Sequence, residues 1–559
     1  MGEYLRFDWK SPHAPNNDRL IFSKGHACPL LYSMFRAAGA ISDDELLSLR
    51  KRESPLQGHP NPRVLPLVDV ATGSLGQGLP IAVGMALNGK YLDKLPYHVW
   101  VVLGDSEMAE GSNYEAFDKA RYYKLNNIVA ILDMNRLGQS GPTDLGWNSA
   151  AYAGRARGFG WHAIEVDGHD LDAIDEAYTE ALNQTDKPTF IVAKTEKGKG
   201  IAAEVNKENF HGKPLDDAAA KTAIEALGGD RHLTIETPKP ESSRPSAPPA
   251  HKPFEPKAYK IGEEEATRKA YGEALVALGA SRPDVVVLDA EVSNSTHSEE
   301  FKKKYPDRFF EMFISEQLLG ASVGLAVLGK VPFASTCAAF LTRAYDQIRM
   351  AAVSNANLRL CGSHAGCSIG EDGPSQMGLE DLAMMRAVCG STVLYPSDPN
   401  QTARLVALMA ETPGISYLYE PGETFEVGGS KVLRRSDADK ATIIAAGITL
   451  HEALKAYDTL KNDGIAVRVI DLYSVKPVDA ATRRQAARDT GNLVVVEDHW
   501  AEGGLGDAVL DAFAGAGETL PTVVKLAVTA MPDSAKPAEL LAAAGIDAHH
   551  IVQAVRSLV

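Results

Sequence analysis

Two apolar runs in the first half of the chain are each followed by a residue that can offer oxygen to a metal ion. Residues 98–103 lead into Gly104 and Asp105, and residues 127–132 lead towards Asn135. Carboxylate, amide and main-chain carbonyl oxygens are hard ligands, and three of them leave room around Mg²⁺ for two phosphate oxygens and a water. A helix after Asp105 would present free amides to a diphosphate. Taken alone, Asp105 is more simply interpreted as a strand-end cap.

A glycine-rich stretch, residues 71–78, precedes an apolar helical pattern. Its glycines either let the backbone approach a bound cofactor or allow close helix packing. The stretch matches neither the dinucleotide-binding fingerprint nor the Walker pattern. Nicotinamide-dependent and P-loop functions are therefore disfavoured.

Four histidines lie within two residues of Gly or Pro and so are expected on turns: His26, His59, His211 and His364. A single histidine on a turn is usually a hydrogen-bonded structural residue, but four of them favour a shared polar site. No pair has the His-x-x-x-His spacing of a helical metal site, so zinc is disfavoured.

Two acidic features in the second half have both a structural and a functional interpretation. Glu316 begins an apolar helical pattern. In the structural interpretation, its carboxylate is stabilised by the dipole of that helix. In the functional one, it lies in an apolar pocket that raises its pKa, so that it can exchange a proton with a ligand. Residues 370–376, Gly-Glu-Asp-Gly-Pro-Ser-Gln, form either a surface turn or part of a site that includes His364.

The elements that must position these residues read as buried strands alternating with helical patterns. Short apolar runs without polar alternation are typical of parallel sheets covered on both faces, and ligands bind beyond the carboxyl ends of such strands. A helix is also expected over 112–123 and another over 338–354. The expected strands are 98–103, 127–132, 189–193, 284–288, 331–334, 358–361, 441–446, 466–470 and 491–496.

One segment interrupts this pattern. Residues 236–257 contain seven prolines and almost no large apolar side chains, so they are expected to form an extended linker. A softer boundary near 427 follows from turn signals alone. The predicted domains are 1–235, the linker 236–257, 258–427 and 428–559, each domain an α/β layer with a mostly parallel sheet flanked by helices.

Composition excludes several classes of protein. The 559 residues carry a formal charge of −16, which disfavours binding to nucleic acid or to a membrane surface. No apolar run approaches the length of about 18 residues that a membrane span needs. Five cysteines without metal-ligand spacing indicate reduced thiols, hence a cytoplasmic protein.

Several of these motifs, in this order along the chain, resemble the transketolase family, and specifically its animal type. The similarity runs from about Asn16 to the C-terminus and is weakest in the linker. The stretches that carry it are 23–26 (Ser-Lys-Gly-His), 73–78, 104–105, 133–139, 210–214, 345–350, 363–376, 395–398 and 496–499 (Val-Glu-Asp-His).

The resemblance implies a thiamine diphosphate enzyme of the pentose phosphate pathway. It implies pyrophosphate-binding, pyrimidine-binding and C-terminal domains, a metal that is Mg²⁺ with Ca²⁺ or Mn²⁺ as alternatives, and a homodimer with active sites at the subunit interface. Such an enzyme moves a two-carbon ketol unit from a ketose, a ketose phosphate or hydroxypyruvate to an aldose, through the thiamine diphosphate ylid.

The resemblance also implies roles for individual residues. Glu316, His26, His59 and His211 would be catalytic, with Glu316 bonded to the aminopyrimidine ring. Metal ligands would be Asp105, Asn135 and the Leu137 carbonyl. The cofactor would contact His26, Gly73, Ser74, Leu75, Ser106, Glu110, Asn135, Lys197, His211, Glu316, Phe340 and Gln376. Arg268, Ser295, His364 and Asp372 would bind the sugar or sugar phosphate.

Three substitutions depart from the family pattern. Ser106 replaces the second glycine of the magnesium motif, and Cys337 replaces a pyrimidine-stacking Phe. Gly422 stands where a second phosphate-binding Arg is expected. Loss of one charge-assisted contact costs about 1.5–3 kcal/mol, so weaker discrimination in favour of phosphorylated sugars is expected.

Family members also carry, before the point where this sequence starts to match, a helical segment with a Gly-His-Pro histidine. We therefore expect a naturally short chain, a separate N-terminal polypeptide as partner, or chemistry without that histidine. The alternatives to an active transketolase are a catalytically impaired or split-subunit relative and a dihydroxyacetone synthase-like enzyme. Deoxyxylulose-phosphate synthase and oxo-acid dehydrogenases fit the histidine set and residues 370–376 less well.

Overall fold

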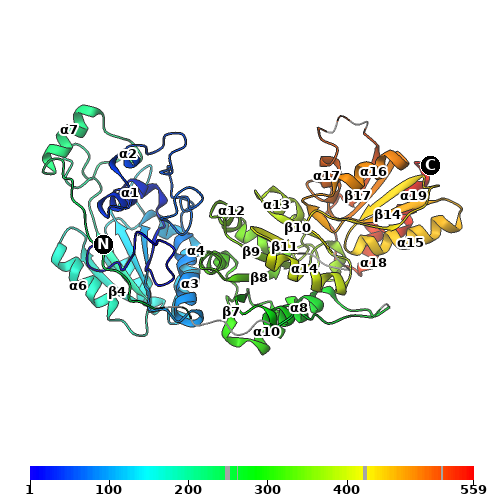
Figure 1. Cartoon of the computed structure of the whole chain (residues 1–559), viewed down its shortest axis with the longest axis horizontal. Helices are drawn as coiled ribbons and strands as arrows, with labels where there is room; N and C mark the ends of the chain where they lie inside the picture. Colours follow the sequence, from blue (N-terminus) through cyan, green and yellow to red (C-terminus); the bar gives the residue numbers. More distant parts are fainter. Residues whose placement is uncertain (244, 246–251, 261, 419–424, 516, 518–519) are drawn as a thin grey trace. The chain divides into compact units, whose positions relative to one another are not determined.

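The computed structural model describes residues 1–559 except 244, 246–251, 261, 419–424, 516 and 518–519 (Figure 1). It contains two compact units. The first comprises Met1–Ala247, Gln317–Gly329 and Val353–Asn355, and the second comprises Pro248–Glu316, Lys330–Ala352 and Ala356–Val559.

The first unit is built on a five-stranded sheet in which all neighbouring strands are parallel. Its order is β1 (Arg19–Phe22), β2 (Val99–Gly104), β3 (Ile128–Met134), β5 (Thr189–Lys194) and β4 (His162–Asp167). Gly104 of β2 pairs with Asp133 of β3. The polar residues that follow these two strands therefore start at the same edge of the sheet.

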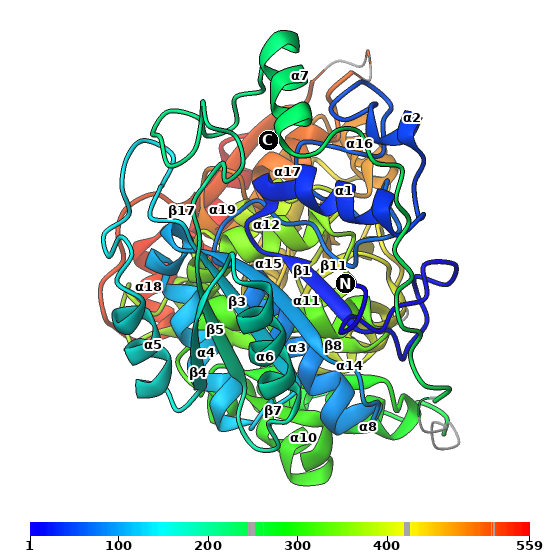
Figure 2. The same cartoon turned by 90° about the vertical axis from the view of Figure 1, so that its left-hand side faces the viewer.

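Helices cover this sheet, and one of them is entirely buried. On one face, Ala177 and Ala181 of α6 (Leu171–Leu182) pack with Val129 and Ile191 of the sheet (Figure 2). All ten residues of α3 (Gly78–Leu87) are buried. The remaining helices of this unit are α1 (Cys28–Ala37), α2 (Asp43–Leu46), α4 (Gly111–Tyr122), α5 (Ser149–Gly158), α7 (Asp217–Ala226) and α11 (Gly320–Val327).

Helices α3 and α11 approach each other at glycines. A Cβ on Gly84 would lie 1.9 Å from the Ala321 carbonyl oxygen, and one on Gly324 would lie 2.1 Å from the Ile81 carbonyl oxygen. Such backbone contact is open only to residues without a side chain.

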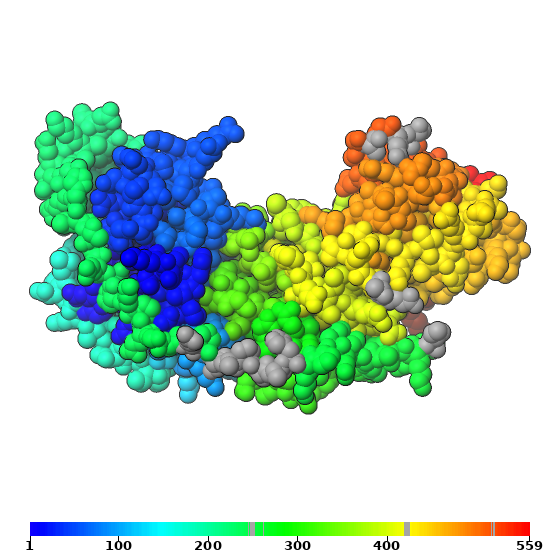
Figure 3. Space-filling view, viewed as in Figure 1, coloured from blue at the N-terminus to red at the C-terminus, as the bar shows by residue number. Residues whose placement is uncertain are grey.

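Helix α7 buries only Ala223 and forms the green projection at the upper left of Figure 3.

The second unit contains two sheets. The seven-stranded sheet is parallel except at one edge, where β15 pairs antiparallel with β10. Its order is β15 (Ser474–Lys476), β10 (Thr392–Leu394), β11 (Ile415–Leu418), β9 (Leu358–Ser363), β8 (Val331–Cys337), β6 (Val285–Asp289) and β7 (Phe309–Glu311). Its helices are α8 (Thr267–Ser281), α9 (Ser293–Thr296), α10 (Glu299–Lys304), α12 (Tyr345–Val353), α13 (Asp381–Ala387) and α14 (Pro399–Glu411).

The five-stranded C-terminal sheet is parallel except for the pair β12–β14. Its order is β12 (Lys431–Arg434), β14 (Val467–Asp471), β13 (Ala441–Ala445), β16 (Asn492–Trp500) and β17 (Thr522–Val528). It is flanked by α15 (Ile448–Asn462), α16 (Ala480–Thr490), α17 (Leu505–Asp511), α18 (Pro537–Ala543) and α19 (Ala548–Arg556).

The predicted fold class is confirmed: three mostly parallel sheets are flanked by helices. Every strand expected from a continuous apolar run is present. The helix expected over 338–354 instead begins with a 3₁₀ segment, Ala338–Ala344, before α12. The described residues of the predicted linker form no helix or strand, and residues 244 and 246–251 of it lie outside the described structure. No helix in the described ranges is long and apolar enough to cross a membrane.

The glycine contact between α3 and α11 predicts a strong asymmetry between two Gly-to-Ala substitutions. Gly84→Ala should lower the midpoint of thermal unfolding, because overpacking of a filled interface costs about 1–3 kcal/mol. Gly154→Ala in α5 should keep or raise it, since a Cβ there meets nothing within 4 Å and alanine favours a helix. Equal midpoints for the two variants, measured by circular dichroism, would contradict this account of the interface.

Candidate functional site

A cavity of about 770 Å³ lies in the first unit, beyond the carboxyl ends of β2, β3 and β5. This is the edge at which ligands bind in open α/β sheets. The structure brings together here ten of the residues named from the sequence: His26, His59, Gly73, Leu75, Asp105, Ser106, Asn135, Leu137, Lys197 and His211.

Asp105 and Asn135 are held rigidly at this edge. Asp105 accepts hydrogen bonds from the backbone amides of Ser106, at 2.9 Å, and Arg136, at 2.6 Å. Asn135 accepts one from the Leu137 amide at 3.0 Å. Burial raises the pKa of Asp105, and a bound cation would offset this cost of burying the charge.

The donor set fits a metal only in combination with a ligand. In the described ranges, no three or more His, Cys, Asp and Glu side chains gather into a metal site. Asp105, Asn135 and the Leu137 carbonyl supply one charge and three oxygens, a set that suits a hard cation whose other ligands are phosphate oxygens and water.

Basic groups crowd the rest of the cavity. The rings of His26 and His211 lie 4.7 Å apart, and Lys197 Nζ lies 3.3 Å from His211 Nδ1. Burial, together with the charges of Lys24, His211, Lys197 and His59, lowers the pKa of His26 to about 4. Burial and the Lys24 charge also lower the pKa of Lys197. A polyanion such as a diphosphate would relieve this repulsion, so the residues present fit one.

One buried carboxylate that the sequence analysis did not single out organises the cavity wall. Glu107 is 1% exposed and accepts hydrogen bonds from the Ser23 hydroxyl, the Gly76 amide at 2.8 Å and the Gly104 amide at 3.0 Å. Burial raises its pKa. The available signal was a second acidic residue two positions after Asp105, but two of its three hydrogen-bond partners, Ser23 and Gly76, are far away in sequence.

Glu316, in the second unit, is buried as expected, but not in an apolar pocket. Its carboxylate pairs with Arg343 Nη1 at 2.7 Å. The Arg343 guanidinium also lies 5.0 Å from the centre of the Phe340 ring. The apolar-pocket alternative for Glu316 is therefore wrong, because Arg343, 27 residues further along the chain in the 3₁₀ segment Ala338–Ala344, reaches back to it.

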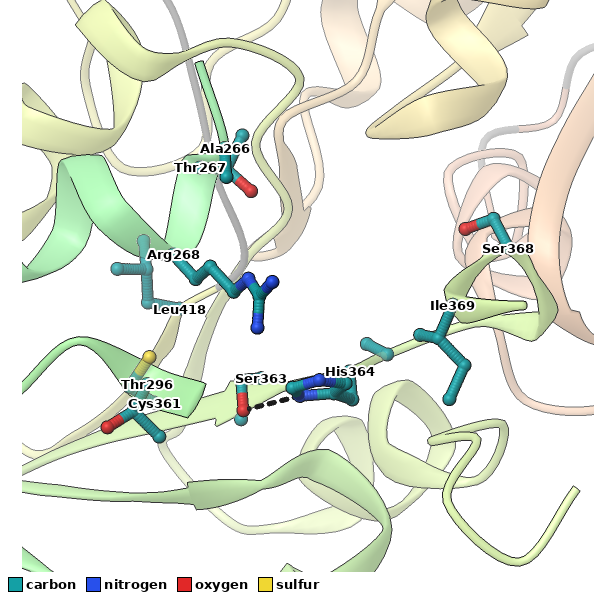
Figure 4. A pocket seen from close by; sticks show the side chains of 12 residues that line it. Ala266, Thr267, Arg268, Thr296, Cys361, Ser363, His364, Ser368, Ile369 and Leu418 are labelled. Atoms are coloured by element: carbon teal, nitrogen blue, oxygen red, sulfur yellow. Dashed lines mark hydrogen bonds between the residues drawn. The ribbon is translucent and has the colours of Figure 1, made fainter. Parts of the chain in front are cut away.

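A second cavity, of about 260 Å³, lies within the second unit (Figure 4). Arg268, in the first turn of α8, reaches towards Ser363 and His364 at the end of β9. His364 Nδ1 lies 3.0 Å from the Ser363 hydroxyl. Burial and the nearby Arg268 charge lower the pKa of His364. A cation, a helix N-terminus and hydroxyl groups make this a favourable place for an anion.

Other expected site residues line neither of these two cavities as the described residues form them. Thr296, rather than its neighbour Ser295, lines the second cavity. Asp372 and Gln376 lie in the 370–376 turn, closed by a hydrogen bond from the Gln376 amide to the Gly373 carbonyl. The residues outside both linings are Ser74, Glu110, Ser295, Glu316, Phe340, Asp372 and Gln376. Gly422 lies outside the described residues.

The low pKa of His26 predicts acid sensitivity. The unfolded chain binds this proton below about pH 6.5, whereas the folded chain binds it only near pH 4. Stability contributed by neutral His26 is therefore lost as the pH falls from about 6.5 to 4.

The His26→Asn variant should lose less thermal stability than the parent protein across that pH interval. His13→Asn, at an exposed turn, is the matched control and should follow the parent. Parallel curves of unfolding midpoint against pH for the parent and the His26 variant would refute this prediction.

Comparison with known proteins agrees with the geometry. Family models match residues 2–244 (transketolase, thiamine diphosphate binding domain), 263–425 (transketolase, pyrimidine binding domain) and 430–551 (transketolase, C-terminal domain). A transketolase from Homo sapiens is 49% identical over 573 residues, covering 99% of this chain and 91% of its own. Transketolase-like protein 1 from Bos taurus is 46% identical over 516 residues, covering 88% of this chain and 85% of its own.

Solved structures show the same fold at lower identity. A transketolase from Campylobacter jejuni superposes with a TM-score of 0.86 at 24% identity and covers 99% of this chain and 93% of its own. One from Leishmania mexicana gives a TM-score of 0.84 at 23% identity, covering 99% and 91%. With three matching domains in order, and relatives of nearly half identical sequence along almost its whole length, the chain belongs to the transketolase family.

Proposed function

We propose that this chain is a transketolase that uses thiamine diphosphate to move a two-carbon ketol unit from a ketose donor to an aldose acceptor. The observation that carries the proposal is the cavity of the first unit, where half-buried basic groups face Asp105 and Asn135 at the carboxyl edge of the sheet. The family membership supplies the identity of the anion.

In this cavity, Lys197, His26 and His211 would bind the diphosphate oxygens. Asp105, Asn135 and the Leu137 carbonyl would hold Mg²⁺. Because backbone amides already fix the Asp105 carboxylate and the Asn135 amide oxygen, these ligands need no rearrangement before the metal binds.

Bound thiamine diphosphate supplies a carbon nucleophile and an electron sink for cleavage of a carbon–carbon bond. Glu316 would hold a ring nitrogen of the aminopyrimidine, and Phe340 would contact the ring face. For this, Arg343 must yield Glu316 or share it, since one oxygen of that carboxylate now accepts its hydrogen bond.

The histidines would move protons of substrate hydroxyl groups. The pKa values of His26, His59 and His211 are all lowered, with burial as the main cause. Each is therefore neutral near pH 7 and able to accept a proton from a hydroxyl group in the transition state.

The second cavity would bind the phosphate of a sugar phosphate. Arg268 supplies the charge, and His364 and Ser363 supply hydrogen bonds.

We further propose a cytoplasmic homodimer acting in the pentose phosphate pathway. The five cysteines are all free thiols, which suits a reducing compartment.

The proposal predicts a difference between two lysines two residues apart. Lys197 lines the cavity, whereas Lys199 is exposed and pairs with Glu196 at 2.7 Å. Lys197→Met should raise the dissociation constant for thiamine diphosphate, measured by calorimetry with Mg²⁺ present, about tenfold or more, because a charge-assisted contact contributes about 1.5–3 kcal/mol. Lys199→Met should leave it unchanged.

The purified parent chain, loaded with both cofactors, should consume hydroxypyruvate when an aldehyde acceptor is present. Turnover by the parent chain and weakened cofactor binding by the Lys197 variant alone would support the assignment. Cofactor binding without turnover would favour the catalytically impaired alternative. Equal cofactor affinity of the two lysine variants would refute the placement of the diphosphate.

A further inference from the structure

The wall of the second cavity is anchored in the C-terminal part of the chain. Residues 366–379 follow β9 of the seven-stranded sheet, yet Cys367, Met377 and Leu379 are buried in the hydrophobic core formed around the C-terminal sheet. That core includes Ile443 of β13 and Val496 of β16. The segment is therefore positioned by the C-terminal sheet and its helices, although the strand before it, β9, belongs to the seven-stranded sheet.

A single buried carboxylate makes the polar part of this anchor. Asp498 of β16 is 0% exposed. Its Oδ1 accepts hydrogen bonds from the Cys367 amide at 2.8 Å and the Cys367 thiol at 2.9 Å. Its Oδ2 accepts one from the Ser368 hydroxyl at 2.5 Å and a longer one from the Ser368 amide at 3.3 Å. Four donors from two consecutive residues converge on one side chain.

The backbone before these residues is shaped for the same contact. Gly366 has φ +85°, and a Cβ there would lie 2.1 Å from Asp498 Oδ2. Its amide donates to the Gly378 carbonyl at 2.7 Å, and the Gly378 amide donates to the His364 carbonyl at 3.0 Å. The position of the carboxylate is thus transmitted through Gly366 to His364.

The anchored segment forms one side of the anion cavity. Ser368 and Ile369 of the segment line it beside Ser363 and His364 at the end of β9, and Figure 4 shows Arg268 on the opposite side, reaching towards Ser363 and His364. A displacement of the segment would change the distance between Arg268 and the hydrogen-bonding groups that face it. Recognition of a tetrahedral anion depends on that distance, because charge-assisted hydrogen bonds weaken steeply away from about 2.7–2.9 Å.

We propose that Asp498 is a positioning residue through which the C-terminal layer sets the affinity of the active site for phosphorylated substrates. It touches neither substrate nor cofactor and acts through residues 366–369. The inference rests on the proposed function, in which the second cavity holds the substrate phosphate.

The test compares Asp498→Asn with Glu497→Gln. Glu497 is the preceding residue of β16 and is 1% exposed, but it accepts hydrogen bonds from the Leu505 and Gly506 amides at the start of α17. Both variants neutralise a buried carboxylate of the same strand. KM and kcat are measured for a phosphorylated aldose acceptor and for glycolaldehyde, which has no phosphate.

Asp498→Asn should raise KM for the phosphorylated acceptor about tenfold, with KM for glycolaldehyde and both kcat values changed less than twofold. Glu497→Gln should leave the ratio of the two KM values as in the parent. If Asp498→Asn does not fold, Cys367→Ala removes one donor from outside the cavity and should raise the same ratio about threefold. A merely structural role for Asp498 would lower kcat for both acceptors alike.

Arg268→Ala separates failure of this inference from failure of the proposed phosphate site. An unchanged KM ratio in Arg268→Ala would overturn the phosphate site and the inference with it. A raised ratio in Arg268→Ala, with parental ratios in Asp498→Asn and Cys367→Ala, would overturn only the positioning role. The positioning role of Asp498 would be established if the ratio of the two KM values rose in Arg268→Ala, Asp498→Asn and Cys367→Ala but stayed parental in Glu497→Gln.

Discussion

The buried carboxylate of Glu107 is the interaction on which the cofactor cavity depends. Burying a charge is costly unless it is fully hydrogen-bonded, and one nearby donor, Gly104, and two distant ones, Ser23 and Gly76, meet this need. Ser23 precedes the turn that carries His26, Gly76 lies within the glycine-rich stretch, and Gly104 precedes Asp105. The carboxylate thus fixes the relative positions of a basic group, a backbone cradle and a metal ligand.

The charges around this centre explain how an acidic chain can bind a polyanion. The formal charge is −16, yet one cavity gathers Lys24, Lys197 and three histidines. Lys24 is compensated by an ion pair with Asp133. Burial, together with the nearby positive charges, lowers the pKa values of His26 and Lys197, and a bound diphosphate would favour their protonated forms.

Local patterns in the sequence were sufficient for the central strands of each sheet and for the edge that bears the site. Continuous apolar runs located the central strands, and the parallel order then placed Asp105 and Asn135 together. Short or half-exposed strands such as β1 and β4 escaped, because they lack such runs. Contacts between residues far apart in the sequence were also missed, because no periodic pattern connects such residues. These contacts are the hydrogen bonds of Glu107, the Arg343–Glu316 ion pair and the hydrogen bonds of Asp498 to residues 367 and 368.

The most direct test of this account replaces Glu107 with Gln and measures both thermal unfolding and the dissociation constant for thiamine diphosphate with Mg²⁺. Gln keeps the volume but replaces one acceptor oxygen with an amide donor that must face the Gly76 or the Gly104 backbone amide, so the unfolding midpoint should fall. The dissociation constant should rise about tenfold or more. Glu497→Gln, another buried carboxylate, should lower the midpoint without altering cofactor affinity. A Glu107 variant that is destabilised but binds the cofactor as tightly as the parent would contradict the central role given to this carboxylate.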